Sequence, residues 1–452
     1  SPIVADVYAN DTKKWRTMLV IGQRQGGTAY TALDVTSGES PAAGNPDPAS
    51  FLWELNDADM GESWADPAVE RVAWPAGGAN AAAWAAFMSS GYHAVDNLQP
   101  TKLAYLFGLE AYTGAPLWKT AAGADTLKIQ VDDETGYQLA YHNYTGLAPD
   151  SNDRVKVVQS GTDICSIKVK KVMAHTDGPN NTGGYGTLLL ESDPAACGFV
   201  ANKGFQTHPK GGTALADGPA TISGQKNNAL NSPVTGNFAH GDHLEDCIYV
   251  GDLYGSMFRV DAIGKGQTPT VSKLFKFSPY PTTPDKTPIR GKASIAYGEN
   301  GSGLWVYYGT GRYETTADKI STHQQYFFGL KDAATPRSVP YGLADLVSLE
   351  ARFATTTVGG TSRNVRVITG SNASAASWAM KLFAGQAGWG GPAVIGGSER
   401  VFTKPLVVGG IVFFTTFIPD ADTCTGSGDT YVFALDYKTG LPPTKPVFDL
   451  NG

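Results

Sequence analysis

Short apolar runs separated by polar turns recur along the chain, and five pairs of these runs share one pattern. In each pair, an apolar run of strand length ends at Gly or at a polar turn. A second run follows, rich in aromatic and β-branched residues, and it typically closes with an acidic residue and a turn that contains Gly. The pattern predicts antiparallel β-hairpins, because Asp can accept backbone N–H groups two residues on and Gly allows positive φ. The five pairs span residues 17–38, 103–118, 247–261, 304–331 and 411–440.

Repeated hairpins of this kind predict an all-β fold in which the copies pack against one another. A single hairpin cannot bury both of its faces, so neighbouring copies must cover it. The Trp that follows one hairpin, Trp118, is typical of the blades of a β-propeller. We therefore expect one β-propeller domain of about seven blades over residues 1–452. The copies are unevenly spaced, so at least one blade lacks a visible signature.

Three segments depart from the hairpin pattern. Residues 78–90 and 341–352 are the two segments that suggest helices. Residues 121–231 are the least regular part, rich in Gly, Asp, Asn and Thr. Within this part, 155–158 and 167–172 alternate apolar and basic residues like strands with one wet face. We expect 121–231 to be an insertion at a blade edge, with a small sheet of its own and irregular loops.

Composition narrows the class of protein. The chain has 54 Gly and 27 Pro, yet 42% hydrophobic and 11% aromatic residues argue against wholesale disorder. A formal charge of −7 argues against nucleic acid as the main partner and gives no reason to expect attraction to an anionic membrane surface. No segment approaches the roughly 20 apolar residues that span a bilayer.

Five stretches occur in an order that resembles the C-terminal domain of PilY-type proteins, the tip-associated biogenesis and adhesion factors of bacterial type IV pili. They include the Trp64-Ala65-Asp66-Pro67 stretch and the Tyr249-Val250-Gly251-Asp252-Leu253-Tyr254-Gly255 strand and turn. The resemblance runs from about residue 17 to residue 440 and does not cover the insertion at 121–231. The five stretches are residues 26–36, 53–67, 231–255, 308–313 and 399–436.

The resemblance implies a modified β-propeller, similar to quinoprotein propellers, in a non-enzymatic pilus biogenesis factor. Such a factor promotes pilus extension by opposing retraction and contributes to surface adhesion. Its implied partners are minor pilins or a pilus-tip complex, together with a ligand on a host or abiotic surface. The implied location is extracellular, at the cell surface or pilus tip, with the periplasm or outer membrane as the place of assembly.

The resemblance also places an EF-hand-like calcium loop just before the strand at Tyr249. In this chain the position is occupied by residues 237–246, and Asp242 and Asp246 match the middle and last acids of the family loop. The earlier acids are replaced by Phe238 and His240.

Asn237 could serve as a ligand if the loop slips by one residue. We therefore predict a degenerate site formed by Asn237, Asp242 and Asp246, at which calcium is bound weakly or no longer bound. Two alternatives stay open: a solvated acidic loop without an ion, and a transition-metal site that adds His240 and His243.

The four cysteines form no Cys-x-x-Cys motif. Cys165 and Cys197 both lie in the predicted insertion, where a crosslink would stabilise a loop-rich segment, and we predict a disulfide between them. Cys247 lies in a predicted inner strand and is expected to be a small buried apolar residue. Cys424 could be free or bonded outside this chain.

Two further functions compete with the pilus factor. A quinone-dependent dehydrogenase would share the blade turn, but such enzymes commonly carry adjacent cysteines over the cofactor and this chain has none, so no quinone is expected. The sequence also lacks Gly-x-Ser-x-Gly, His-Glu-x-x-His and P-loop motifs. The third candidate is a pure adhesin that binds surface ligands through residues 121–231.

Overall fold

The computed structural model divides the chain into two compact units. The first unit is Ser1–His93, Tyr105–Val131 and Ala229–Gly452, and the second is Ala94–Ala104 and Asp132–Asn228. The structure describes the chain except for residues 1, 25, 37–49, 79–80, 92–103, 120–124, 132–136, 145–153, 160–161, 177–183, 191–203, 209–217, 225–227, 240, 278–285, 359, 387, 391–395, 421–426, 446 and 448–452.

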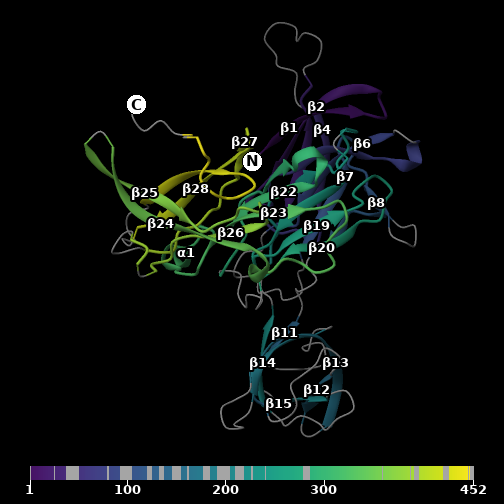
Figure 1. Cartoon of the computed structure of the whole chain (residues 1–452). Helices are drawn as coiled ribbons and strands as arrows, with labels where there is room; N and C mark the ends of the chain where they lie inside the picture. Colours follow the sequence, from purple (N-terminus) through teal and green to yellow (C-terminus); the bar gives the residue numbers. More distant parts are fainter. Residues whose placement is uncertain are drawn as a thin grey trace. The chain divides into compact units, whose positions relative to one another are not determined.

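Antiparallel sheets make up the first unit, so the all-β prediction is confirmed (Figure 1). The first sheet has the order β1 (Ile3–Ala9), β2 (Lys14–Gly22), β3 (Ala29–Asp34), β4 (Ser50–Asn56). The second contains β10 (Lys128–Gln130), β7 (Tyr105–Glu110), β6 (Ala82–Ser89) and β5 (Ala68–Ala73). The third contains β17 (Val234–Gly236), β18 (Cys247–Gly251), β19 (Met257–Asp261) and β20 (Thr270–Phe275).

The fourth and fifth sheets complete this series. The fourth contains β21 (Ser294–Tyr297), β22 (Leu304–Gly309), β23 (Tyr326–Asp332), β26 (Trp378–Lys381), β24 (Val347–Val358) and β25 (Thr361–Thr369), and its β24–β26 pair is parallel. The fifth contains β27 (Leu406–Val408), β28 (Ile411–Pro419) and β29 (Gly428–Asp436). A separate pair joins β8 (Trp118–Lys119) to β9 (Asp125–Thr126). The helical elements are short: α1 (Thr316–Ile320), η1 (Pro75–Gly77), η4 (Glu299–Gly301) and η5 (Leu343–Asp345).

Four of the five predicted hairpins are confirmed, as the pairs β2–β3, β18–β19, β22–β23 and β28–β29. Their turns work as the sequence suggested. Asp34 Oδ1 accepts the Thr36 N–H at 2.8 Å, and Asp436 Oδ1 accepts the Lys438 N–H at 3.1 Å. Gly440, four residues after Asp436, has φ of 67°, which favours Gly over residues that carry a Cβ.

The remaining predicted hairpin, 103–118, is present in a shorter form: Leu109 and Pro116 form an antiparallel bridge, and the Leu117 N–H donates to the Gly108 carbonyl at 3.1 Å. Both predicted helices were wrong. The segment 78–90, predicted to be helical, contains β6, which pairs with one edge of β7. Strand β6 pairs with β5 on one edge and β7 on the other, and Ala85 to Ser89 are all buried. Burial on both faces removes the alternation that marks a strand, and sheet pairing overrides the helix propensity of Ala. At 341–352, the structure has a 3-10 turn, η5, followed by β24.

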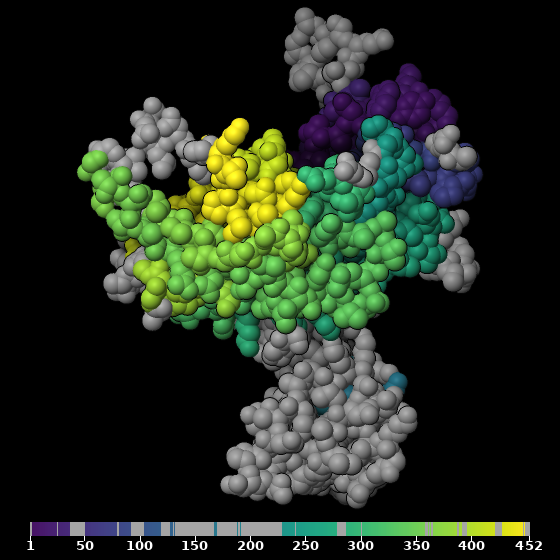
Figure 2. Space-filling view, in the orientation of Figure 1, coloured from purple at the N-terminus to yellow at the C-terminus, as the bar shows by residue number. Residues whose placement is uncertain are grey.

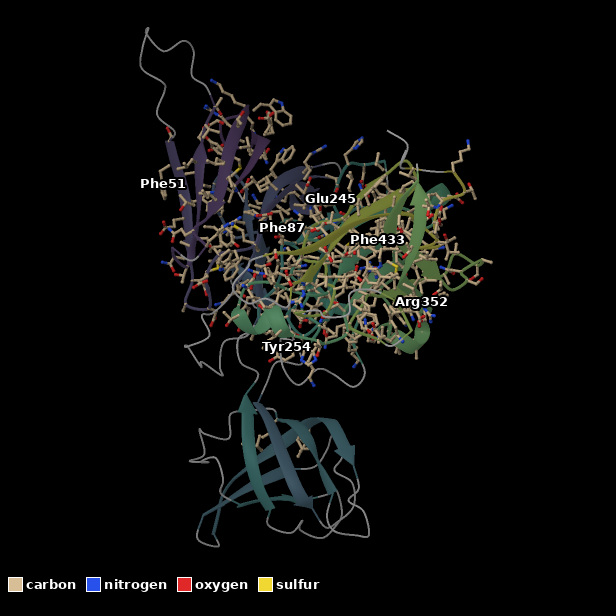
Figure 3. All side chains as sticks on the ribbon, turned by 90° about the vertical axis from the view of Figure 1, so that its left-hand side faces the viewer. Phe51, Phe87, Glu245, Tyr254, Arg352 and Phe433 are labelled. Atoms are coloured by element: carbon tan, nitrogen blue, oxygen red, sulfur yellow. The ribbon has the colours of Figure 1, made fainter. Side chains whose placement is uncertain are left out.

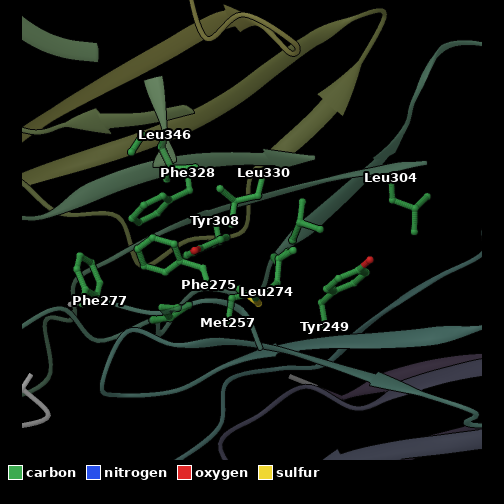
Figure 4. Packing of buried hydrophobic residues seen from close by; sticks show 14 of the residues in the cluster. Tyr249, Met257, Leu274, Phe275, Phe277, Leu304, Tyr308, Phe328, Leu330 and Leu346 are labelled. Atoms are coloured by element: carbon green, nitrogen blue, oxygen red, sulfur yellow. The ribbon is translucent and has the colours of Figure 1, made fainter. Parts of the chain in front are cut away.

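Neighbouring sheets of the first unit share apolar cores. The first and second sheets pack around Tyr30, Met88 and Phe107. The third and fourth pack around Tyr249, Phe275 and Phe328, as Figure 4 shows. Aromatic side chains supply much of this contact, as expected where sheets pack face to face.

The fourth and fifth sheets are joined by Phe327 and Phe414, whose rings stack at 3.6 Å between centroids. These two sheets form the adjoining green and yellow surface in Figure 2. The first strands of successive sheets also touch one another in chain order: β1 contacts β5, β5 contacts β17, β17 contacts β21, and β21 contacts β27.

The second unit contains a closed barrel, and the predicted insertion at 121–231 overlaps with this unit. The strand order is β11 (Tyr137–Tyr144), β14 (Gly184–Leu190), β13 (Thr162–Thr176), β12 (Arg154–Gln159), β15 (Gly204–His208), β16 (Gly218–Gly224), and β11 also pairs with β16 (Figure 1). Ile167 and Val169 are buried, whereas Lys168 between them is not. The apolar and basic alternation therefore corresponds to the inner and outer faces of a barrel strand.

Candidate functional site

The predicted calcium loop, residues 237–246, connects β17 to β18. Gly236 and Cys247 are opposite each other in the strand pair, so the loop closes a hairpin. The Asp246 N–H donates to the Gly236 carbonyl at 2.9 Å, which fixes the end of the loop against its start. Asn237 is buried, while Asp242 lies exposed at the loop's surface.

Hydrogen bonds within the loop engage one oxygen of each of its two predicted carboxylate ligands. Asp242 Oδ1 accepts the Asn237 side-chain amide and the Leu244 N–H, each at 3.0 Å. Asp246 Oδ2 accepts the Phe238 N–H at 2.7 Å and the Ala239 N–H at 3.4 Å. The structure thus joins Asn237 to Asp242, as the ligand prediction requires, but through the amide N–H₂ rather than an oxygen.

These contacts change the acidity of Asp242. The backbone N–H of Leu244, followed by the Asn237 amide, lowers the pKa of the Asp242 carboxyl below its usual value, although partial desolvation opposes this shift. For the Asn237 oxygen to bind a calcium ion together with Asp242, the Asn237 amide would have to turn from the orientation seen here. Within the described part of the chain, no group of three or more His, Cys, Asp or Glu side chains is arranged to hold a metal, and His240 lies outside that part. Calcium at this loop therefore stays a prediction.

A buried arginine lies directly behind the loop. The Arg259 guanidinium carbon is 4.5 Å from the centroid of the Phe238 ring, and Phe238 stands where the family resemblance places an acid. Arg259 is 2% exposed, and it bonds Asp332 Oδ2 at 2.9 Å and Asp261 Oδ1 at 2.6 Å. Tyr249 also donates to Asp332, at 2.7 Å. Two carboxylates balance the Arg259 charge, so the loop packs against a buried ion-pair network.

Sequence reasoning missed two acidic residues, Glu245 within the loop and Glu70 in β5. The Glu245 N–H donates to the Arg71 carbonyl at 2.8 Å, which joins the end of the loop to β5 and so brings Glu245 near Glu70. Burial, and then the charge of Glu70, raise the pKa of Glu245 to about 7 (Figure 3 labels this residue). Burial raises the pKa of Glu70 as well. No sequence signal could have paired them, because they come from distant parts of the chain.

The cysteine predictions have two outcomes. Cys247 is a free, fully buried thiol whose Sγ donates to the Gly236 carbonyl at 3.6 Å, so its expected role as a small buried residue is confirmed. Cys197, Cys424 and the side chain of Cys165 lie outside the described residues, so the Cys165–Cys197 disulfide stays a prediction.

Among the helices that the structure describes, none is long and apolar enough to cross a membrane.

Comparison with known proteins identifies relatives along the whole chain. No model of a known protein family matches it. A protein named type IV pilus biogenesis factor PilY1 homolog, from Xylella fastidiosa, is 24% identical over 97% of this chain. The type IV pilus biogenesis factor PilY1 of Pseudomonas aeruginosa is 23% identical over 100% of it. The chain spans 22% and 31% of the lengths of these two relatives.

A solved structure matches the fold. The crystal structure of the Pseudomonas aeruginosa PilY1 C-terminal domain superposes with a TM-score of 0.57 at 19% identity, covering 100% of this chain and 73% of that one. The sequence similarity and the shared fold agree with the order of motifs read from the sequence. This chain therefore has the sequence relationship and the fold of a PilY-type C-terminal domain.

Proposed function

We propose that this chain is part of a non-enzymatic type IV pilus biogenesis factor. The observation that carries the proposal is the similarity over almost the whole chain to two proteins named as such factors, one of which contributes a domain of the same fold. In this proposal the chain promotes pilus extension by opposing retraction, through contacts with minor pilins or a pilus-tip complex. Its place of action is the pilus tip or cell surface, reached through the periplasm and outer membrane.

The proposed architecture of the first unit is a modified β-propeller of about seven blades. The contacts between first strands of the five described sheets, from β1 to β27, support the propeller arrangement, because blades follow one another around a propeller with their inner strands adjacent. The number of blades stays a prediction. Closure of the ring would also remove the two unpaired edges that an open series of sheets leaves exposed.

Buried charges in the first unit support a scaffold rather than a catalytic role. Arg366 bonds Glu399 in bidentate fashion, at 2.9 and 2.7 Å, and Glu399 also accepts the Thr416 hydroxyl at 2.6 Å and the Phe383 N–H at 2.8 Å. Every oxygen of this buried carboxylate has a partner within the protein. A carboxylate satisfied in this way holds strands of the fold together, as a scaffold requires.

Surface adhesion is a second proposed role, and the barrel of the second unit supports it. The barrel forms a compact unit separate from the sheets that resemble propeller blades. A separate unit of this kind is suited to present loops to a surface ligand while the first unit engages the pilus machinery. Binding of purified protein to host cells or abiotic surfaces, with and without residues 132–228, tests this role.

Deletion of the whole stretch, residues 1–452, from the natural protein tests the pilus function. We expect fewer surface pili, and we expect piliation to return when the retraction motor is also removed. A Lys14→Ala variant, altered at an exposed strand position, is the matched control and should keep normal piliation. Unchanged piliation after the deletion would contradict the proposal. Absorbance of a bound quinone in purified protein would instead support the dehydrogenase alternative.

A further inference from the structure

A cavity of about 300 Å³ lies within the first unit. Its walls come from segments that precede or follow strands of all five sheets. Its volume is at the lower end of the range for small-molecule sites, roughly 300–1,000 Å³. We call it the cationic cavity and define it by Arg24, Trp64, Arg290, Lys292, Tyr313 and Lys404.

Positive charge gathers in the cationic cavity against the balance of the whole chain. Two arginines and two lysines line it, but only two acids, Asp66 and Glu314, do so. The formal charge of the full sequence is −7. A concave site whose lining has an excess of one charge concentrates the opposite charge, so the cavity favours an anion.

The two arginines are held in place before any ligand arrives. The guanidinium carbons of Arg24 and Arg290 lie 5.5 and 5.6 Å from the centroid of the Trp64 ring. The indole is fixed in turn, because its Nε1 donates to Glu62 Oε2 at 2.7 Å. Arg290 is further oriented by its ion pair with Glu314. A positioned guanidinium matches the geometry of a carboxylate and loses less freedom on binding it.

The lysines show that the positive charge here is incompletely balanced. Lys292 is half-buried, and burial, followed by the charge of Lys404, lowers the pKa of the Lys292 ammonium group. Asp66 and Glu70 oppose this shift but do not cancel it. An anionic group placed beside Lys292 would supply the missing compensation.

One wall of the cationic cavity is aromatic. The Tyr313 ring lies nearly parallel to that of Phe402, at 6.4 Å between centroids and an interplanar angle of 17°. Phe417 meets Tyr313 edge-on at 5.0 Å and holds it from another side. An aromatic face held in this way packs well against the C–H face of a compact saturated ring.

We propose that the cationic cavity binds a small carboxylate ligand about the size of one sugar ring. The carboxylate lies among Arg290, Lys292 and Lys404, and the carbon skeleton packs against Tyr313. An acidic sugar and an acyclic organic acid share the carboxylate chemistry, and the aromatic wall favours the acidic sugar. The proposal stands apart from the pilus role, since it rests on the lining of this cavity alone.

Calorimetric titration of the purified chain with glucuronate, succinate and glucose tests the proposal. We expect glucuronate to bind and glucose, which is similar in size but uncharged, not to bind. Higher salt should weaken the binding, because the charges are partly exposed. Succinate binding as tightly as glucuronate would assign the site to acyclic carboxylates, and weaker succinate binding would assign it to acidic sugars.

Lys292→Ala should weaken glucuronate binding by about tenfold, the loss expected for one charge-assisted hydrogen bond. Lys404→Ala, at an exposed position, should weaken glucuronate binding as well. It tests the proposal if Lys292→Ala fails to fold. Lys14→Ala, at the exposed end of β2 that lies away from Arg24, should leave glucuronate binding unchanged. Three results would overturn the proposal. They are glucose binding as tightly as glucuronate, no binding of either acid, and unchanged glucuronate binding by both Lys292→Ala and Lys404→Ala.

Discussion

The loop at 237–246 and the cationic cavity both concentrate charge, but their charges have different partners. In the loop, the carboxylates of Asp242 and Asp246 accept backbone N–H groups from residues within the same loop. In the cavity, four cationic side chains converge from distant segments with only two acids among them. A cluster of charge that is continuous in sequence can satisfy itself, whereas charge assembled by the fold can remain available to a ligand.

The pKa shifts of Asp242 in the loop and of Lys292 in the cavity agree with this difference in charge balance. Hydrogen bonds lower the pKa of Asp242, so its surroundings favour the charged form. Burial and Lys404 lower the pKa of Lys292, so its surroundings disfavour the charged form. An ion of opposite charge therefore gains little at the loop and more at the cavity.

The largest expected effect concerns the buried cation behind the loop. Arg259→Ala leaves Asp332 buried without its charge partner, and we expect a loss of about 3–5 kcal/mol in the free energy of unfolding. Urea unfolding measures it. Arg352→Ala is the matched control, because the Arg352–Glu350 pair is partly exposed to solvent and should contribute less than about 1 kcal/mol. Similar losses in both variants would show that Arg259 is not a buried support of the loop.

A smaller effect is expected at Glu245, the loop residue that faces the charge of Glu70 in β5. The folded pKa of Glu245 is raised from 4.5 to about 7, so its contribution to stability is fully present below pH 4.5 and is lost as pH rises through 7. Glu245→Gln should therefore stabilise the protein at pH 8, by about 1 kcal/mol once partial exposure is taken into account. Urea unfolding at pH 5 and pH 8 measures the difference, and a variant less stable at pH 8 than the unaltered chain would contradict it.

Asp242 should show the opposite dependence on pH, and a weaker one. Its folded pKa is lowered from 3.8, so its stabilising contribution is present above that value and is lost as pH falls below it. Because the side chain is exposed, Asp242→Asn should cost less than about 0.5 kcal/mol at pH 7. A carbon-13 NMR titration of the carboxyl follows this group directly. A midpoint above 3.8 would show that the loop hydrogen bonds do not persist in solution.

The smallest expected effect is that of calcium on the loop. If the dissociation constant is near the millimolar end of calcium sites, 1 mM calcium adds only about 0.4 kcal/mol to the free energy of unfolding. Calorimetry of the unaltered chain and of Asp246→Ala tests this. Micromolar binding that the substitution abolishes would show that the loop keeps a full calcium site and would reverse the comparison with the cavity.

The sequence by itself determined the elements whose cause is local. The hairpins at 17–38, 247–261, 304–331 and 411–440 follow from apolar runs closed by turns, and Asp34 and Asp436 bond the turn N–H groups two residues on. The position of the loop at 237–246 was likewise visible. Turn chemistry acts over two to four residues, so it can be read without knowing what packs around it.

Only the tertiary structure decided the state of residues whose partners are distant in the chain. The sequence of β6 suggests a helix because the strand is buried between β5 and β7, and its apolar and polar residues therefore do not alternate. The raised pKa of Glu245 depends on Glu70, and the cationic cavity joins Trp64 to Lys404. Burial and charge balance are sums over spatial neighbours, and no pattern along the chain records which neighbours those will be.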